Sequence, residues 1–186
     1  MNNLVTILSF SPRNDGNCVK IGDVLRDFHK QTNVRLYSIT AENYKACSGC
    51  NYECLTPSAL CPSITPYQKE VMDAVKESNL VYMIVPNFCG HPCANFYAYN
   101  ERCIGYFNGD RALMGQYLSV PKKFIVVSNT ESDTFYAALK QQVNIEPDML
   151  YLKTGKYKKR STAGDLMDSE DAVADLMAFV VPEGSI

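Results

Sequence analysis

Short apolar runs alternate along the chain with segments in which apolar residues recur every three or four positions. Continuous apolar runs are typical of strands buried in a parallel sheet, and the second pattern is typical of amphipathic helices. We therefore expect strands at residues 4–8, 34–39, 80–85, 124–127 and 149–152. We expect helices over residues 21–28, 67–75, 92–107, 135–143 and 172–180. This alternation predicts an α/β fold, in which helices cover both faces of a parallel sheet through right-handed crossovers.

The loops that follow the strands are where a ligand would bind. In open α/β sheets, ligands lie beyond the carboxyl ends of the strands. The loops concerned are residues 9–18, 47–66, 86–92 and 128–133. No internal repeat or linker divides the chain, so we expect one domain over residues 1–186, with a cysteine-rich insertion at 44–65. The basic stretch Lys153 to Arg160 is expected to be a solvated loop, and its charge run, Lys156 to Arg160, could dock an acidic electron donor such as ferredoxin.

Composition and charge narrow the classes of function. The chain has 186 residues, and a hydrophobic content of 46% fits a globular protein. Its net charge of −2 gives no electrostatic reason to expect nucleic acid or an anionic membrane as partner. No apolar stretch approaches the roughly 18 residues of a membrane helix. The run Leu4 to Phe10 is short and follows no basic region, so we interpret it as a strand, not a signal peptide. A cytoplasmic location is expected.

The first of these loops, Ser9 to Cys18, has the composition of an anion site. A helix N-terminus offers unpaired N–H groups and the positive end of a dipole. Ser9, Ser11 and Asn17 add short polar side chains, and Arg13 adds a positive charge. An ordinary polar turn would use the same residue types, so loop chemistry alone leaves both interpretations open.

The second loop contains four cysteines. Cys47, Cys50, Cys54 and Cys61 are spaced C-x2-C-x3-C-x6-C, and Pro62 follows. Cytoplasmic thiols stay reduced, so a cluster of them indicates metal or redox chemistry. An iron–sulfur cluster, a zinc ion, and a loop of thiols without metal are all compatible with this spacing.

Two motifs resemble a known family. The first is Ser11-Pro-Arg-x-x-Gly-Asn, and the second is Pro86-Asn-Phe-Cys-Gly-His-Pro followed by Tyr99-Asn-Glu-Arg102. Together they resemble motifs of the NADPH-dependent FMN reductase and iron–sulfur flavoprotein group, which has a flavodoxin-like fold. The resemblance implies a three-layer sandwich around a five-stranded parallel sheet of order 2-1-3-4-5. Phe10 and Cys18 depart from the family pattern, which has glycine and serine or threonine there.

The resemblance also implies a cofactor site. FMN would be bound at the end of the sheet by Ser9, Ser11, Arg13, Asn17, Cys18, Pro86, Asn87, Phe88, Cys89, Gly90, Ser128 and Asn129. The four loop cysteines would ligate a [4Fe–4S] cluster, and NAD(P)H or ferredoxin would supply electrons. The expected protein is a flavin-dependent oxidoreductase, acting on a small-molecule or protein redox partner. The alternative is a redox- or metal-responsive binding module with a degenerate flavin site.

Three smaller expectations concern other side chains. The aromatic residues of the 92–107 helix are interpreted as an interface of a homodimer or homotetramer, with core packing as the alternative. Cys89, Cys93 and Cys103 are interpreted chiefly as packing residues. His29, at the end of a helix, is expected to be solvated.

Overall fold

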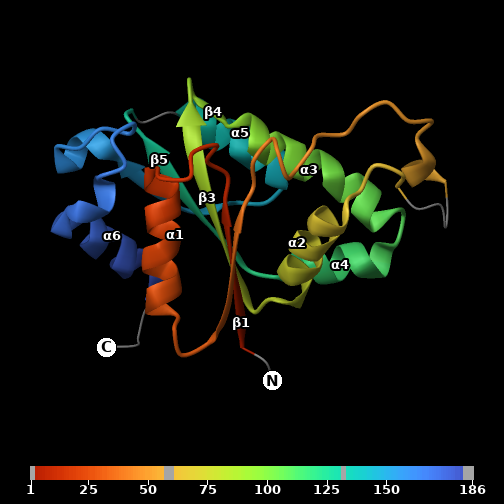
Figure 1. The fold of residues 1–186 in the computed structure, drawn as a ribbon, viewed down its shortest axis with the longest axis horizontal. Coiled ribbons are helices and arrows are strands. Elements are labelled where there is room, and N and C mark those ends of the chain that lie inside the picture. The colour runs from red at the N-terminus through yellow and green to blue at the C-terminus, as the bar shows by residue number, and fades with distance from the viewer. Residues whose placement is uncertain (1–2, 57–60, 131–132, 182–186) are drawn as a thin grey trace.

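A computed structural model describes residues 3–56, 61–130 and 133–181. Parts of the predicted 44–65 insertion and of the 128–133 loop, namely residues 57–60 and 131–132, lie outside the described residues. Five parallel strands form the sheet, in the order β2-β1-β3-β5-β6 (Figure 1). They are β1 (Leu4–Ser9), β2 (Asn33–Ser38), β3 (Leu80–Phe88), β5 (Lys122–Ser128) and β6 (Asp148–Lys153). The predicted order 2-1-3-4-5 is confirmed, because the remaining strand, β4 (His91–Pro92), only pairs antiparallel with the end of β3.

Helices cover both faces of the sheet, as predicted. One face carries α1 (Asn17–Phe28) and α6 (Glu170–Val180), and the other carries α2 (Pro66–Glu77), α3 (Ala94–Phe107), α4 (Arg111–Ser119) and α5 (Asp133–Val143) (Figure 1). Three short 3-10 helices lie at Glu53–Leu55, Thr154–Tyr157 and Leu166–Asp168. Residues of β1 alternate between the two cores: Val5 and Ile7 pack on the α1 side, and Leu8 packs on the α2–α3 side.

Local sequence explains where several helices begin. Thr65 and Gln68 form a capping box ahead of α2, and Pro66 occupies the first helical position. The carboxylate of Asp110 accepts hydrogen bonds from the amides of Ala112 and Leu113 and so starts α4. Helix α4 has no counterpart in the apolar pattern, because Tyr117 is its only buried residue.

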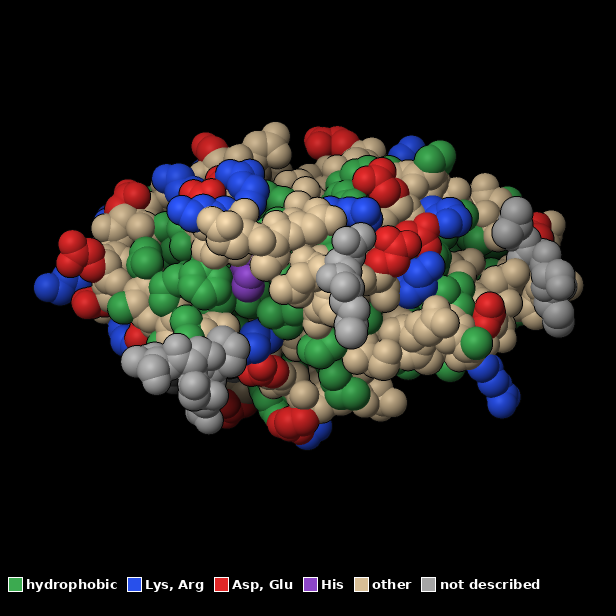
Figure 2. All heavy atoms as spheres, turned by 90° about the horizontal axis from the view of Figure 1, so that it is seen from below, with side chains coloured by type: hydrophobic (Ala, Val, Ile, Leu, Met, Phe, Trp, Pro, Cys, Tyr) green, Lys and Arg blue, Asp and Glu red, His purple; other side chains and the backbone are tan. Residues whose placement is uncertain are grey.

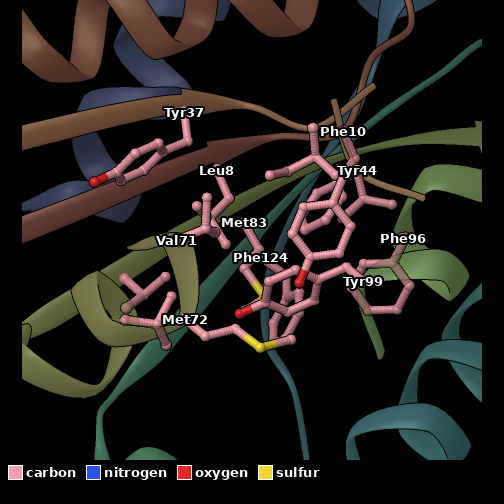
Figure 3. Close-up of a cluster of buried hydrophobic side chains, with 14 of the residues drawn as sticks. Leu8, Phe10, Tyr37, Tyr44, Val71, Met72, Met83, Phe96, Tyr99 and Phe124 are labelled. Carbon is pink, nitrogen blue, oxygen red and sulfur yellow. The ribbon is translucent and has the colours of Figure 1, made fainter. Parts of the chain in front are cut away.

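The aromatic residues of α3 correct one expectation. Phe96, Tyr99 and Tyr106 are buried in the core, so the expectation that these three rings form an interface is wrong, whereas Tyr97 and Phe107 are half-buried. Figure 3 shows Phe96 and Tyr99 gathered around Phe10, whose ring lies edge-on to both at centroid distances of 5.2 and 5.5 Å. The density of aromatic residues on this helix therefore reflects packing against the sheet.

His29 and the basic stretch Lys153 to Arg160, both expected to be solvated, make specific contacts instead. The Nε2 atom of His29 lies 3.1 Å from the Tyr82 hydroxyl, and desolvation lowers the pKa of this imidazole. Within the basic stretch, Thr154 and Tyr157 are buried, and the Tyr157 hydroxyl donates to Asp175 of α6 at 2.7 Å.

The surface agrees with the modest net charge. Figure 2 shows the molecule from the amino-terminal edge of the sheet, where acidic and basic side chains are interspersed and neither sign forms a continuous field. No helix among the described residues is long and apolar enough to cross a membrane.

Candidate functional site

The hydroxyl of Ser9 is a buried polar group without a partner. Ser9 ends β1 and is 1% exposed, and its Oγ makes no hydrogen bond. Strand alternation places its side chain on the α1 face, with Val5 and Ile7. A buried hydroxyl without a partner costs about 1–3 kcal/mol, so its presence at the end of a strand points to a ligand that would complete it.

The N-terminus of α1 follows this serine and is also incomplete. Gly16 is the N-cap residue and supplies no side-chain cap. Its carbonyl accepts from the amides of Val19 and Lys20, and helix geometry leaves the amides of Asn17 and Cys18 without an intrahelical carbonyl partner. Unpaired amides at the positive end of a helix dipole form an anion site.

The side chain of Asn17, expected to bind an anion, is instead hydrogen-bonded to a distant segment of the chain. Its Nδ2 donates to the carbonyls of Ser161 and Arg160 at 3.0 and 3.3 Å, and its Oδ1 accepts from the amide of Leu166 at 2.9 Å. The side chain is therefore a clamp for residues 160–166, here called the strap. Its backbone amide, and not its side chain, is what remains for an anion.

Arg13 is held by the same strap. Its guanidinium donates to Asp15 Oδ1 at 3.1 and 3.3 Å and to the carbonyl of Thr162. The Ser11 hydroxyl accepts from the amide of Arg13 at 3.1 Å. Gly164 sits at a φ of +72°, and a Cβ there would come within 2.7 Å of the Asp15 carbonyl oxygen, so the strap and the first loop fit only with glycine.

The two departures from the family pattern both place their side chains in the core. The ring of Phe10 packs on α3, as described above. Cys18 is buried, and burial together with the nearby Cys93 thiol raises its pKa to about 12. Cys18 is thus a neutral packing residue whose amide, like that of Asn17, faces the loop.

The 86–92 loop is a β-hairpin. Cys89 and Gly90 both have positive φ, 53° and 84°, as in a two-residue type I′ turn. Phe88 is 54% exposed, and Cys89 and His91 are exposed beside it. Pro86, still within β3, pairs with Val127 of β5. The hairpin thus presents an apolar ring and a thiol above the carboxyl edge of the sheet.

Asn87 fixes this hairpin to the neighbouring strands. Its Oδ1 accepts from the amide of Gly90 at 2.9 Å, and its Nδ2 donates to Ser128 Oγ at 3.0 Å and to the Tyr151 hydroxyl at 2.6 Å. Tyr151 in β6 was not among the predicted site residues, because only the tertiary structure brings its hydroxyl to this edge. The network makes the hairpin a fixed wall.

Ser128 and Asn129 close the same edge. The Ser128 hydroxyl donates to the carbonyl of Thr130 at 2.6 Å. Asn129 Oδ1 accepts from Thr154 Oγ1 at 3.1 Å and from the amide of Ser161 at 3.3 Å. The strap therefore joins the first loop to the end of β5. The first loop, the 86–92 hairpin and the end of β5, which contain the predicted FMN-site residues, all lie along one edge of the sheet (Figure 1).

The cysteine loop is anchored by a buried arginine. Arg102 of α3 is 2% exposed and donates to the carbonyls of Lys45 and Ala46. Its remaining nitrogen lies 3.7 Å from Cys61 Sγ. No ion pair joins Arg102 to a carboxylate among the described residues, so its charge is met by carbonyl oxygens and a thiol.

The four loop thiols are near one another but do not form a ready-made metal site. Desolvation and the nearby thiols of Cys61, Cys50 and Cys47 raise the pKa of Cys54. Cys61 is buried, whereas Cys47 is exposed. Within the part of the chain that the structure describes, no three His, Cys, Asp or Glu side chains are arranged to hold a metal ion.

Solved structures show the same fold, although no protein-family model and no curated protein matches this sequence. Smu.1420 from Streptococcus mutans UA159 is 14% identical, with a TM-score of 0.62 over 95% of this chain and 96% of that chain. FerB, a flavoenzyme NAD(P)H:(acceptor) oxidoreductase from Paracoccus denitrificans, is 13% identical, with a TM-score of 0.55 over 96% and 95%. A flavone reductase is 11% identical, with a TM-score of 0.56 over 95% of this chain. The match covers only 60% of the reductase chain. The protein has a flavodoxin-like fold.

Proposed function

We propose that this protein is a flavin-dependent oxidoreductase that binds FMN at the carboxyl edge of its sheet. The unpartnered Ser9 hydroxyl, beside the uncapped N-terminus of α1, is the observation that carries the proposal. FerB and the flavone reductase are named as oxidoreductases and share this fold, which supports the same assignment.

The phosphate of FMN would be bound by the first loop. The amides of Asn17 and Cys18 and the hydroxyls of Ser9 and Ser11 supply hydrogen-bond donors, and Arg13 supplies positive charge. The strap keeps these groups in place through the Asn17 clamp. A preorganised set of donors binds an anion without the entropic cost of ordering a loop.

The isoalloxazine ring would lie against the 86–92 hairpin. Pro86, Asn87, Phe88, Cys89 and Gly90 line one side of it in this proposal, and Ser128 and Asn129 line the other. When bound, FMN supplies hydride and single-electron transfer, which no side chain provides. The network centred on Asn87 would orient the ring by holding the hairpin fixed to β5 and β6.

The electron donor and the acceptor belong to the same proposal. NAD(P)H is proposed as donor, with a small molecule or a protein such as ferredoxin as redox partner. A homodimer or homotetramer and a cytoplasmic location stay predictions.

A [4Fe–4S] cluster in the cysteine loop stays a prediction. Cys47, Cys50, Cys54 and Cys61 supply the thiolates that a [4Fe–4S] cluster needs, and the buried charge of Arg102 beside Cys61 would balance an anionic cluster. As arranged in the described residues, these thiols do not form a metal site, and the proposed FMN chemistry does not depend on this loop.

A titration with two flavins tests the function. FMN added to the protein should be bound with quenching of its fluorescence, and riboflavin, which lacks the phosphate, should bind at least about tenfold more weakly because it forgoes the charge-assisted bonds of the first loop. Iron and sulfide analysis of protein purified without oxygen runs alongside. Failure to bind FMN would refute the proposal, and metal content without FMN binding would favour the metal-responsive module.

A further inference from the structure

A cavity lies between α3, α4 and the turn that follows α5. It encloses about 310 Å³, within the size range of small-molecule sites. Its walls are largely apolar and come from Met83, Phe107, Met114, Leu118, Val143 and Ile145. Met114, Leu118 and Ile145 are 38%, 56% and 52% exposed, so the cavity opens to solvent through an apolar rim.

Lys122 is the charged residue of this cavity. Its Nζ donates to the carbonyls of Tyr117 and Val120, both at 2.8 Å, and lies 5.0 Å from the centroid of the Tyr117 ring. An ammonium has three donors, so one N–H is left for a ligand. Burial lowers the pKa of Lys122 to about 8, which means that its charge has lost much of its solvation and gains from an anionic partner.

A second donor in the cavity has no partner. Asn100, on α3, lines the same space, and its Nδ2 atom is buried without a hydrogen bond. The described lining residues include no aspartate or glutamate. The buried polar groups with unused hydrogen-bonding capacity in this cavity, Lys122 Nζ and Asn100 Nδ2, are therefore donors, and they call for a ligand that accepts.

The other titratable groups around Lys122 are neutral. Burial raises the pKa of the Cys103 thiol to about 11 and the pKa of the Tyr99 and Tyr117 hydroxyls well above their ordinary value. The two tyrosine hydroxyls are hydrogen-bonded to each other, and the Cys103 thiol lies 3.8 Å from that of Tyr117. Lys122 therefore faces no built-in counter-ion among the described groups of α3 and α4.

This cavity is separate from the proposed FMN site. Lys122 begins β5 and Ser128 ends it. The six residue-to-residue steps between them in an extended strand span about 20 Å, and the two lie at opposite edges of the sheet.

We infer that this cavity is a binding site for a small monocarboxylate with an apolar body, such as a medium-chain or aryl carboxylic acid. The carboxylate accepts from Lys122 Nζ and Asn100 Nδ2, and the apolar body fills the space between α3, α4 and the turn after α5. The single cation and the one buried, unpartnered amide nitrogen match one carboxylate, whereas a polyphosphate would leave most of its charge against apolar walls.

Calorimetric titration with octanoate and with octanol tests this site. The two probes share one apolar body, so octanoate should bind at least about tenfold more tightly because only it is charged. Lys122→Met should remove that preference, whereas Lys123→Met should keep it, because Lys123 projects to the opposite face and donates to Phe179. Asn100→Leu, which breaks no hydrogen bond made by Nδ2, should weaken octanoate severalfold and keeps the test valid if Lys122→Met fails to fold.

The pH dependence gives a second readout. Octanoate stays ionised above pH 6, so its affinity should be constant up to about pH 8 and fall above it, as the unliganded lysine loses its proton. Equal binding of octanol and octanoate, or no binding of either, would overturn the inference. A dimer that dissociates on Leu118→Asp would also overturn it, because the rim would then be covered by a second copy of the chain.

Discussion

The first loop and the cysteine loop both follow strands of one sheet, yet the structure uses their polar groups differently. In the first loop, the side chains of Asn17 and Arg13 donate to the strap, so the hydrogen-bond donors that remain for a ligand are the hydroxyls of Ser9 and Ser11 and the backbone amides of α1, with Arg13 nearby as a positive charge. In the cysteine loop, one buried arginine holds the backbone, while thiols such as Cys47 stay exposed. A sequence motif therefore shows which polar groups a loop contains, whereas long-range contacts determine which of these groups are available to bind a ligand.

Removing the anchor of the cysteine loop should have the largest effect. Arg102→Met deletes the donors to Lys45 and Ala46 inside the protein, and we expect a loss of about 3 kcal/mol in the free energy of unfolding, measured by urea denaturation. Residues 45–56 should also become sensitive to limited proteolysis. Arg111→Met, at an exposed position, is the control and should change neither measurement. An Arg102→Met protein as stable as the wild type would show that the loop is anchored elsewhere.

Disturbing the contact between the strap and the first loop should cost less. Gly164→Ala introduces a Cβ at positive φ and 2.7 Å from the Asp15 carbonyl, so we expect a loss of about 1–3 kcal/mol by thermal unfolding and weaker FMN binding. Gly115→Ala is a matched control within α4. It meets no atom within 4 Å and should stabilise the protein by about 0.5–1 kcal/mol. Equal effects of the two substitutions would contradict the close fit of the strap.

Thiol reactivity should separate the two loops without any substitution. Alkylation followed by mass spectrometry should label the exposed Cys47 within minutes at pH 7.5 and leave Cys18 unmodified in the folded protein, because Cys18 is buried with its pKa raised to about 12. Raising the pH from 7 to 9 should accelerate labelling of Cys54, whose pKa is also raised. Fast labelling of Cys18 would place its thiol at the surface of the first loop.

Features that depend on local pattern could be predicted from the sequence. The five parallel strands follow from apolar runs such as Leu80 to Val85, since strands covered on both faces are apolar throughout. Helix α4 could not, because a single buried residue gives no periodicity. The Asn17 clamp and the Lys122 cavity join residues distant in sequence, and no local pattern encodes such contacts.

A pair of β1 variants isolates the role of the Ser9 hydroxyl in the proposed phosphate site. Thr6, like Ser9, has a buried hydroxyl, but it donates to the Ala74 carbonyl and accepts from Ser78 on the other face of the sheet. Thr6→Val should therefore lower stability by about 1–2 kcal/mol and leave the Kd for FMN unchanged.

Ser9→Ala should do the reverse. Stability should hold or rise slightly, because an unsatisfied hydroxyl is removed, and the Kd for FMN should increase about tenfold. The deciding measurement is the FMN titration of Ser9→Ala against the wild type. A tenfold weaker affinity is what the proposed phosphate site predicts, and an unchanged affinity would contradict it.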